Sequence, residues 1–311
     1  MKDIDYSVII PVYNSEQIVS ETVQRTIQFF NAHDFSFEIT LINDGSKDNS
    51  WNTIKELAEN SDHVTAVNLL KNYGQHSAIL CGIHYSSGKY LITLDDDLQN
   101  PPEEIIKLID KIHEGYDLVF AKFREKKHSA FRKRGSKLVN YFNAKIFNKP
   151  KDLVLTNFRI FTRDVANRII HYKTFYPYIP GLLIMFSSSM ANVETEHKSR
   201  KVGKSNYSMF KILKLIARLL FNYSSFPLKV MTYIGVSVSM ISFFIGIYFI
   251  LKKLIDGVAV EGWTTIIVLL AFFNGFLIIM VGIMGEYLSR VLNQVSSTRA
   301  YETKEVVRYE K

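Results

Sequence analysis

Two long stretches near the C-terminal end of the chain carry almost no charge, and they constrain its fold more than any other feature. From Leu228 to Leu251 the only charged residue is Lys229, and from Trp263 to Gly285 there is none. Each stretch exceeds the roughly 20 residues that a helix needs to cross a bilayer. Helices buried in a soluble core rarely remain apolar on every side for so long. The sequence therefore predicts two transmembrane helices, at about 228–251 and 263–285, in preference to two buried helices.

The charges around these stretches predict their orientation. Basic residues precede the first stretch and follow the second, at Lys211, Lys214, Arg218, Lys229, Arg290 and Arg299. The segment between them is less informative, because its two lysines are balanced by two acidic residues. Cytoplasmic flanks of membrane helices tend to be basic, so both termini are expected in the cytoplasm. Residues 1–5 lead into a strand without the apolar core of a signal peptide, which predicts a multi-pass protein of the inner (cytoplasmic) membrane.

The overall charge of +8 predicts an anionic partner. Nucleic acid, an anionic membrane surface and a phosphorylated substrate are all compatible with such a charge. The single cysteine, Cys81, has no partner for an internal disulfide and is expected to be a small buried residue.

Before these stretches, apolar segments alternate with amphipathic ones. Strands are predicted at about 7–14, 37–43, 64–70, 90–94 and 116–121, with helices between them and a late strand at 190–198. Strands that alternate with helices of 10 to 15 residues indicate an α/β fold with a mostly parallel, doubly wound sheet. Right-handed crossovers would bring the ends of the first, second and fourth strands to one edge.

Carboxylates follow these strand ends. Asp95, Asp96 and Asp97 come directly after the fourth strand, and Asp44 follows the second. Three adjacent carboxylates repel one another unless a cation or hydrogen-bond donors stabilise them, and oxygen ligands suit Mg²⁺ or Mn²⁺. The alternative is a solvated acidic loop. We expect Asp44, Asp95 and Asp97 to share one crevice with Tyr13.

The residues of this crevice could bind a nucleotide without a glycine-rich phosphate-binding loop. The chain has no Gly-x-Gly-x-x-Gly after the first strand and no Walker A loop. A nucleotide would therefore be held by carboxylates and a metal ion, an arrangement that suits a nucleotide-sugar with its diphosphate leaving group.

Four motifs in order carry a family resemblance. They are Pro11-Val-Tyr-Asn, Asn43-Asp-Gly-Ser, Asp95-Asp-Asp-Leu-Gln-Asn-Pro-Pro-Glu and Gly285-Glu-Tyr-Leu-x-Arg. Together with the two apolar stretches, they make the chain similar to glycosyltransferase family 2, whose fold is called GT-A. The resemblance is greatest to the polyprenyl-phosphate glycosyltransferases, such as dolichol-phosphate mannose synthases and bacterial undecaprenyl-phosphate sugar transferases.

The resemblance implies a role for each matching residue at the donor site. Pro11, Tyr13 and Asp44 would contact the nucleotide, with Asp44 at the base or ribose. Asp95 would contact the nucleotide-sugar and act in catalysis. Asp97 would be the main ligand of a divalent ion, Mg²⁺ or Mn²⁺, and Gln99 a second contact to it. Where the family more often has a small residue, this chain has Asp96. Its side chain would either point away from the site or tune the metal, and we expect it to point away.

The resemblance also implies an acceptor site beside the membrane. Arg132 and Ser136, in a basic and aromatic segment at about 129–148, correspond to residues near a phosphate. Arg200 and Ser205 belong to a loop similar to the family's Arg-x-x-Gly-x-Ser-Lys-Tyr. The basic segment is expected to form an interfacial helix, and a second amphipathic helix is expected at 207–226. Asn157 receives no role, and Arg159 either lines the donor site or is structural.

The predicted protein is a membrane-bound inverting glycosyltransferase. It would transfer a sugar from a nucleotide-sugar, with a UDP-sugar favoured, to a polyprenyl (undecaprenyl) phosphate on the cytoplasmic face, for a cell-envelope glycan or lipid modification. The expected parts are a catalytic domain at 1–206, the amphipathic helix, a transmembrane region at 227–288 and a cytoplasmic tail at 289–311. A homo-oligomer is compatible with the resemblance.

Several alternatives remain open from the sequence alone. They are a glycosyltransferase with another lipid or glycan acceptor, a non-catalytic membrane-anchored nucleotide-binding scaffold, and a basic membrane protein that binds nucleic acid. The lipid acceptor is favoured over nucleic acid because of the adjoining apolar stretches. The sugar also stays open, although the segment 72–78 resembles undecaprenyl-phosphate 4-deoxy-4-formamido-arabinose transferases.

Overall fold

The computed structural model describes residues 4–123, 130–197, 209–256, 262–296 and 300–309. The chain divides into two compact units, which are described separately. The first comprises Met1–Ile212 together with Ser297–Lys311, and the second comprises Leu213–Ser296.

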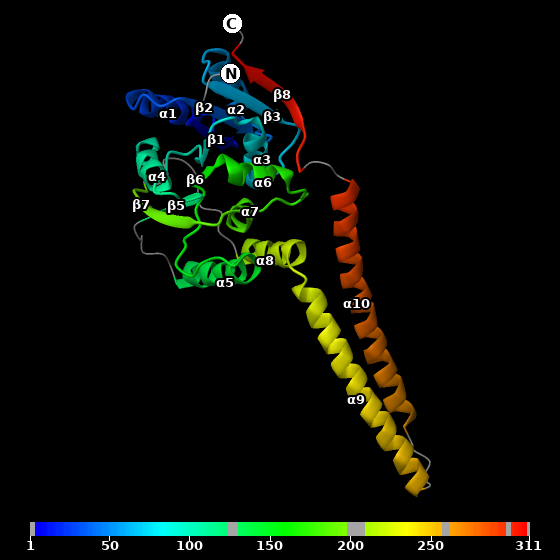
Figure 1. Cartoon of the computed structure of the whole chain (residues 1–311). Coiled ribbons are helices and arrows are strands. Elements are labelled where there is room, and N and C mark those ends of the chain that lie inside the picture. The colour runs from blue at the N-terminus through cyan, green and yellow to red at the C-terminus, as the bar shows by residue number, and fades with distance from the viewer. Residues whose placement is uncertain (1–3, 124–129, 198–208, 257–261, 297–299, 310–311) are drawn as a thin grey trace. The chain divides into compact units, whose positions relative to one another are not determined.

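The first unit is built on a mixed sheet of eight strands in the order β7-β5-β6-β4-β1-β2-β3-β8 (Figure 1). The strands are β1 Tyr6–Val12, β2 Phe37–Asn43, β3 Val64–Leu69, β4 Tyr90–Thr93, β5 Leu118–Phe123, β6 Arg159–Thr162, β7 Met190–Thr195 and β8 Thr303–Arg308. The four strands β4, β1, β2 and β3 are parallel neighbours, whereas β6 and β8 run antiparallel to their neighbours. The predicted α/β fold is therefore confirmed, and the ends of β1, β2 and β4 lie side by side as expected.

Helices cover both faces of this sheet. Their bounds are α1 Val19–Ala32, α2 Ser50–Glu59, α3 Gln75–Tyr85, the 3-10 turn η1 Pro102–Glu104, α4 Ile105–Ile112, α5 Ala130–Phe147, α6 Arg163–His171 and α7 Ile179–Phe186. Alternate strand residues such as Val8 and Ile10 form one core with α1, α2 and α4. On the opposite face α3 approaches so closely that a Cβ added at Gly82 would lie 2.3 Å from Cγ2 of Ile9. Cys81, on the same helix, is buried as predicted.

The strand β8 is a feature that the sequence analysis did not predict. It comes from the segment expected to be a tail, and it pairs with β3 so that Val306 lies opposite Val67. An ion pair of 2.8 Å between Lys55 Nζ and Glu305 Oε1 joins it to α2. Burial alternates along the strand, as expected for the edge of a sheet. The chain thus returns to the first unit after the second unit ends.

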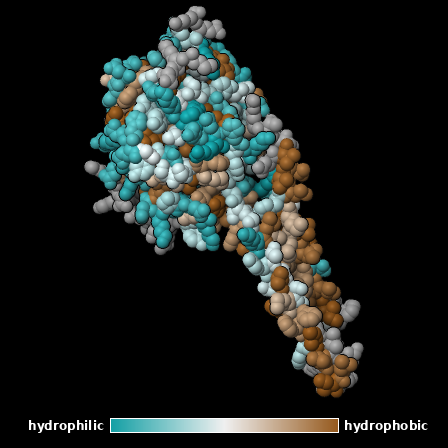
Figure 2. Space-filling model, viewed as in Figure 1, coloured by the Kyte–Doolittle hydropathy of each residue, from teal (hydrophilic) through white to brown (hydrophobic). Residues whose placement is uncertain are grey.

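The second unit contains most of α8 Met209–Tyr223, and the whole of α9 Phe226–Asp256 and α10 Trp263–Ser296. Two helical segments are long and apolar enough to cross a membrane, Phe226–Ile245 and Phe272–Leu292. Only 6% and 0% of their residues are buried, which does not fit helices inside a soluble core. Figure 2 shows hydrophobic side chains along this pair of helices.

The motif Gly285-Glu-Tyr-Leu-x-Arg forms hydrogen bonds near the end of α10. Tyr287 Oη donates a hydrogen bond of 3.0 Å to the backbone oxygen of Ser224. Arg290 donates to the Asn222 side chain and to Glu286. These contacts tie α10 to the turn between α8 and α9.

Candidate active site

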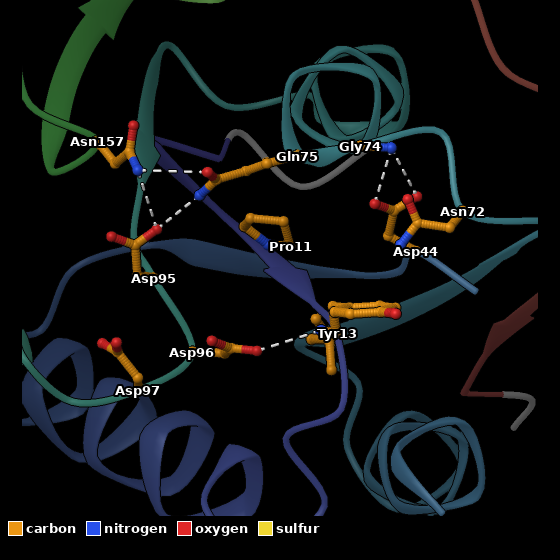
Figure 3. Close-up of a pocket in the computed structure, with 11 residues that line it drawn as sticks. Pro11, Tyr13, Asp44, Asn72, Gly74, Gln75, Asp95, Asp96, Asp97 and Asn157 are labelled. Atoms are coloured by element: carbon orange, nitrogen blue, oxygen red, sulfur yellow. Dashed lines mark hydrogen bonds between the residues drawn. The ribbon is translucent and has the colours of Figure 1, made fainter. Parts of the chain in front are cut away.

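A cleft of about 410 Å³ opens where β1, β2 and β4 end (Figure 3). Its lining residues are Pro11, Val12, Tyr13, Asp44, Asn72, Gly74, Gln75, Asp95, Asp96, Asp97 and Asn157. The structure therefore brings Tyr13, Asp44, Asp95 and Asp97 to one crevice, because parallel strands present their carboxyl ends at one edge.

One end of the cleft is organised around Asp44, which is only 4% exposed. Its carboxylate accepts backbone hydrogen bonds from Tyr73 at 2.7 Å and from Gly74 at 2.9 Å. Burial raises the pKa of Asp44, and these two hydrogen bonds oppose that rise. The carboxylate is thus held by the backbone of the loop that follows β3.

Gly45 makes this arrangement possible. Its φ is +65°, and a Cβ added there would lie 2.5 Å from the backbone nitrogen of Asn72. Both the left-handed conformation and the close approach require glycine. The Asn-Asp-Gly-Ser motif therefore brings the loops after β2 and β3 together.

The other end of the cleft is organised around Asp95. Gln75 Nε2 donates to Asp95 Oδ1 at 2.8 Å, and Asn157 Nδ2 lies 3.5 Å from the same oxygen. Burial raises the pKa of Asp95 to about 7, and the negative charges of Asp97 and Asp96 add to the rise. At neutral pH the Asp95 carboxyl therefore exchanges between its protonated and ionised forms, and a nearby cation would favour the ionised form.

The expectation that the Asp96 side chain points away from the site is wrong. Asp96 lines the cleft, where its Oδ2 accepts hydrogen bonds from the Ser15 hydroxyl and, at 3.3 Å, from the Tyr13 backbone nitrogen. Burial raises the pKa of Asp96 to about 6, against the effect of the Ser15 hydrogen bond. The loop after β1 offers these donors, so the side chain turns towards the loop and stays at the cleft.

Asp97 lies at the start of a tight turn. The backbone nitrogen of Gln99 donates to Asp97 Oδ1 at 3.1 Å, and Leu98 between them is buried with a φ of 55°. Gln99 itself does not line the cleft. A non-glycine residue with positive φ is strained, and the burial of Leu98 holds this turn in place.

These carboxylates fit a hard divalent cation. Their oxygens are the ligands that Mg²⁺ and Mn²⁺ prefer, and a cation would relieve the repulsion that raises the pKa of Asp95. Within the described ranges, no group of three or more His, Cys, Asp or Glu residues converges on one metal position. The remaining ligands would therefore be water and substrate phosphate, as is usual for Mg²⁺.

Sequence reasoning missed Gln75 and Asn157 as cleft residues. Gln75 begins the helix after β3, so the rule that located Asp44 could have found it. Asn157 precedes β6, an antiparallel strand that the apolar pattern did not predict. Arg159 does not line the cleft and is fully buried beneath it.

The structure does not describe the side chains of the four predicted acceptor residues. The side chains of Arg132 and Ser136, near the start of α5, lie outside the described part of the structure. Arg200 and Ser205 lie outside the described residues altogether.

The chain is similar to known proteins in sequence and in fold. The family model described as glycosyl transferase family 2 matches residues 7–175. The undecaprenyl-phosphate 4-deoxy-4-formamido-L-arabinose transferase of Proteus mirabilis is 34% identical, over 97% of this chain and 93% of its own length. The protein of the same name from Edwardsiella ictaluri is also 34% identical, over 97% and 94%.

Among solved structures, the fold is similar to that of glucosyl-3-phosphoglycerate synthase from Mycobacterium tuberculosis. That protein was crystallised with Mn²⁺, UDP and phosphoglyceric acid. The TM-score is 0.53 at 16% identity, over 70% of this chain and 77% of that one. At this identity the likeness shows a shared fold.

Proposed function

The chain belongs to glycosyl transferase family 2 and is a glycosyltransferase, and we propose that it transfers a sugar from a UDP-sugar to a polyprenyl phosphate at a membrane. The observation that carries this proposal is the cleft, with a buried carboxylate at one end and three crowded carboxylates at the other. The curated relatives, named as undecaprenyl-phosphate transferases, match nearly the whole chain, including both apolar helices.

The two ends of the cleft suit the two ends of a nucleotide-sugar. Asp44, Tyr13 and Pro11 would hold the base and ribose, while Asp97 would hold a divalent cation beside the diphosphate. The sugar would then lie against Asp95, Gln75 and Asn157. Support for UDP and a divalent cation comes from the structural neighbour, which was solved with UDP and Mn²⁺.

The chemistry is a displacement at the anomeric carbon. An oxygen of the lipid phosphate forms the new bond to that carbon, the bond to the UDP oxygen breaks, and UDP leaves with the electron pair. A divalent cation, when bound, stabilises the charge that develops on UDP. The phosphate is already an anion at neutral pH, so no strong base is needed. The Asn157 amide beside Asp95 cannot accept a proton from the acceptor, which is compatible with such a mechanism.

The protein is a membrane protein, and we place its catalytic unit and both termini on the cytoplasmic side. The pairing of β3 with β8 supports a common side for both termini, because β3 precedes the two apolar helices α9 and α10 in the chain and β8 follows them. The basic flanks favour the cytoplasm. Arg132, Ser136, Arg200 and Ser205 are the proposed contacts of the lipid phosphate.

A transfer assay tests this function directly. The purified full-length protein would be incubated with Mn²⁺, undecaprenyl phosphate and a set of UDP-sugars, and the lipids would be examined by mass spectrometry. We expect one lipid-linked sugar to form. Parallel reactions would replace the lipid with 3-phosphoglycerate, the acceptor type of the structural neighbour. Transfer to 3-phosphoglycerate alone, or nucleotide binding without transfer to any acceptor, would contradict the proposal.

A further inference from the structure

A buried polar cluster lies beneath the Asp95 end of the cleft, and the proposed function leaves it unexplained. Its centre is Arg159 on β6, which is 0% exposed. Arg159 Nε donates to Thr93 Oγ1 at 3.0 Å, and Nη1 lies 3.4 Å from the Thr156 backbone oxygen. Its Nη2 is buried and has no hydrogen-bond partner among the residues that the structure describes.

Two aromatic side chains complete the cluster. The ring of His76, the second residue of α3, meets the ring of Tyr178 edge to face at 5.3 Å. His76 Nδ1 is also buried without a partner in the described ranges. Burial and the nearby charge of Arg159 lower the pKa of His76 to about 4, so the ring is neutral at pH 7. Tyr178 is 8% exposed and forms a side-chain hydrogen bond with Asn143.

Unused donors of this kind are uncommon in a folded protein. A buried guanidinium is strongly unfavourable unless its charge and its N–H groups are compensated. Asp95 offsets part of the charge of Arg159, but Nη2 still lacks an acceptor. Nearly all buried polar groups have partners, and those without one often mark a missing water, ion or ligand.

Two side chains of the cleft wall adjoin the cluster in sequence, because Gln75 directly precedes His76 and Asn157 lies two residues before Arg159. Asn157 lines the cleft beside Gln75, and Asn157 Nδ2 lies 3.4 Å from Gln75 Oε1 and 3.5 Å from Asp95 Oδ1 (Figure 3). Both distances are at the limit of hydrogen bonding. Moving the Asn157 amide aside would therefore break no short side-chain hydrogen bond among the described residues.

We propose that Arg159, His76 and Tyr178 form a subsite that receives a carbonyl oxygen carried by the donor sugar, in an acylamino or carboxyl substituent. The inference rests on the proposed function, because it assumes that the sugar lies at the Asp95 end. A guanidinium has donors and no acceptor, so it pairs with an oxygen that has free lone pairs. A sugar with a free amine would present an ammonium group to Arg159 and be repelled.

Donor binding tests this subsite without relying on lipid transfer. Affinities would be measured by calorimetry with Mn²⁺ for two matched pairs of donors. One pair is UDP-4-deoxy-4-formamido-L-arabinose and UDP-4-amino-4-deoxy-L-arabinose, which differ only by the formyl group. The other pair is UDP-glucuronic acid and UDP-glucose. We expect the carbonyl-bearing member of at least one pair to bind about 10- to 100-fold more tightly, the range for a hydrogen bond to a charged group.

Three variants test whether the cluster causes the tighter binding of the carbonyl-bearing donor. Arg159→Lys, His76→Phe and Tyr178→Phe should each bring the ratio of affinities in the preferred pair closer to one. The two substitutions to phenylalanine keep the ring packing, so they carry the test if Arg159→Lys fails to fold. The control is His84→Phe on the same helix. His84 is exposed, and its Nδ1 forms a hydrogen bond of 2.9 Å with the Leu80 backbone oxygen one turn away, so this variant should keep the wild-type ratio.

The outcomes separate this inference from the proposed function. Equal affinities within both pairs would overturn the subsite, as would variants that weaken binding of UDP itself by the same factor as the donors. A carbonyl preference that the variants remove would support the subsite even if no lipid product formed, and in that case the proposed function would fail alone. Lipid transfer without any carbonyl preference would support the function and overturn the subsite.

Discussion

The two ends of the cleft hold their carboxylates in different ways. Asp44 accepts hydrogen bonds from two backbone nitrogens, so its position is set by the path of the chain. Asp95 and Asp96 are held mainly by the side chains of Gln75 and Ser15, and burial raises the pKa of both. Backbone donors thus oppose the rise that burial causes in the pKa of Asp44, whereas the charges of Asp97 and Asp96 add to the rise in the pKa of Asp95. A cation would therefore stabilise the ionised form of the Asp95 end.

The largest effect that would sharpen this contrast is expected from Asp97→Asn. The amide keeps the size of the side chain but removes the charge proposed to hold the cation. We expect the transfer rate to fall about 1,000-fold, since electrostatic stabilisation of a leaving group is worth several kcal/mol. The rate would be measured against Mn²⁺ concentration. A variant that reached the wild-type rate at saturating Mn²⁺ would remove Asp97 from the proposed metal site.

At the Asp44 end, a substitution in the neighbouring turn, Gly45→Ala, should lower the stability of the fold more than it changes the chemical step. Gly45→Ala would place a Cβ 2.5 Å from the Asn72 nitrogen at a φ of +65°, and we expect a loss of about 2–4 kcal/mol in the free energy of unfolding. Urea unfolding of the protein in detergent would measure it. The control is Gly115→Ala, which also has a positive φ but meets nothing within 4 Å. If both variants lost the same free energy, the close approach of the two loops would not matter.

A third test uses pH at the Asp95 end. The pKa of Asp95 is raised to about 7, so the folded protein keeps a proton there at pH 6 that it has lost at pH 8. A cation must displace this proton, and its affinity should therefore be about tenfold weaker at pH 6 than at pH 8. Titration with Mn²⁺ followed by electron paramagnetic resonance would measure the change. Equal affinity at the two pH values would show that the crowded carboxylates are already ionised.

The smallest effect is expected from Asp96→Ala. It removes the hydrogen bonds from Ser15 and the Tyr13 nitrogen, and we expect about 1 kcal/mol less stability and a rate reduced less than tenfold. Ser15→Ala should have a similar effect on stability. Because the two side chains share one contact, the double variant should lose less than the sum of both. A rate loss as large as that of Asp97→Asn would instead place Asp96 in the metal site.

The patterns that were read correctly from the sequence are local ones. Apolar runs predicted the strands of the parallel centre, and the positions of Asp44, Asp95 and Asp97 at strand ends predicted their meeting in one cleft. Two stretches with almost no charge predicted α9 and α10. In each case the pattern of apolar and polar residues within one short segment indicates the element, so no information about distant residues is needed to predict it.

What the sequence did not reveal depends on partners far away in the chain. Strand β8 is a short edge strand whose pairing with β3 spans more than two hundred residues of sequence. Asn157 reaches the cleft because β6 runs antiparallel beside β4, and no periodicity encodes that neighbour.

The sequence by itself thus determined the class of the fold, the membrane-length helices and the family. Only the tertiary structure decided where Asp96 points, which amides border Asp95, and that Arg159 is buried beneath them. The physical reason is that the orientation of a side chain follows from the donors and acceptors that folding brings to it. For Asp96 these donors belong to the loop after β1, more than eighty residues away.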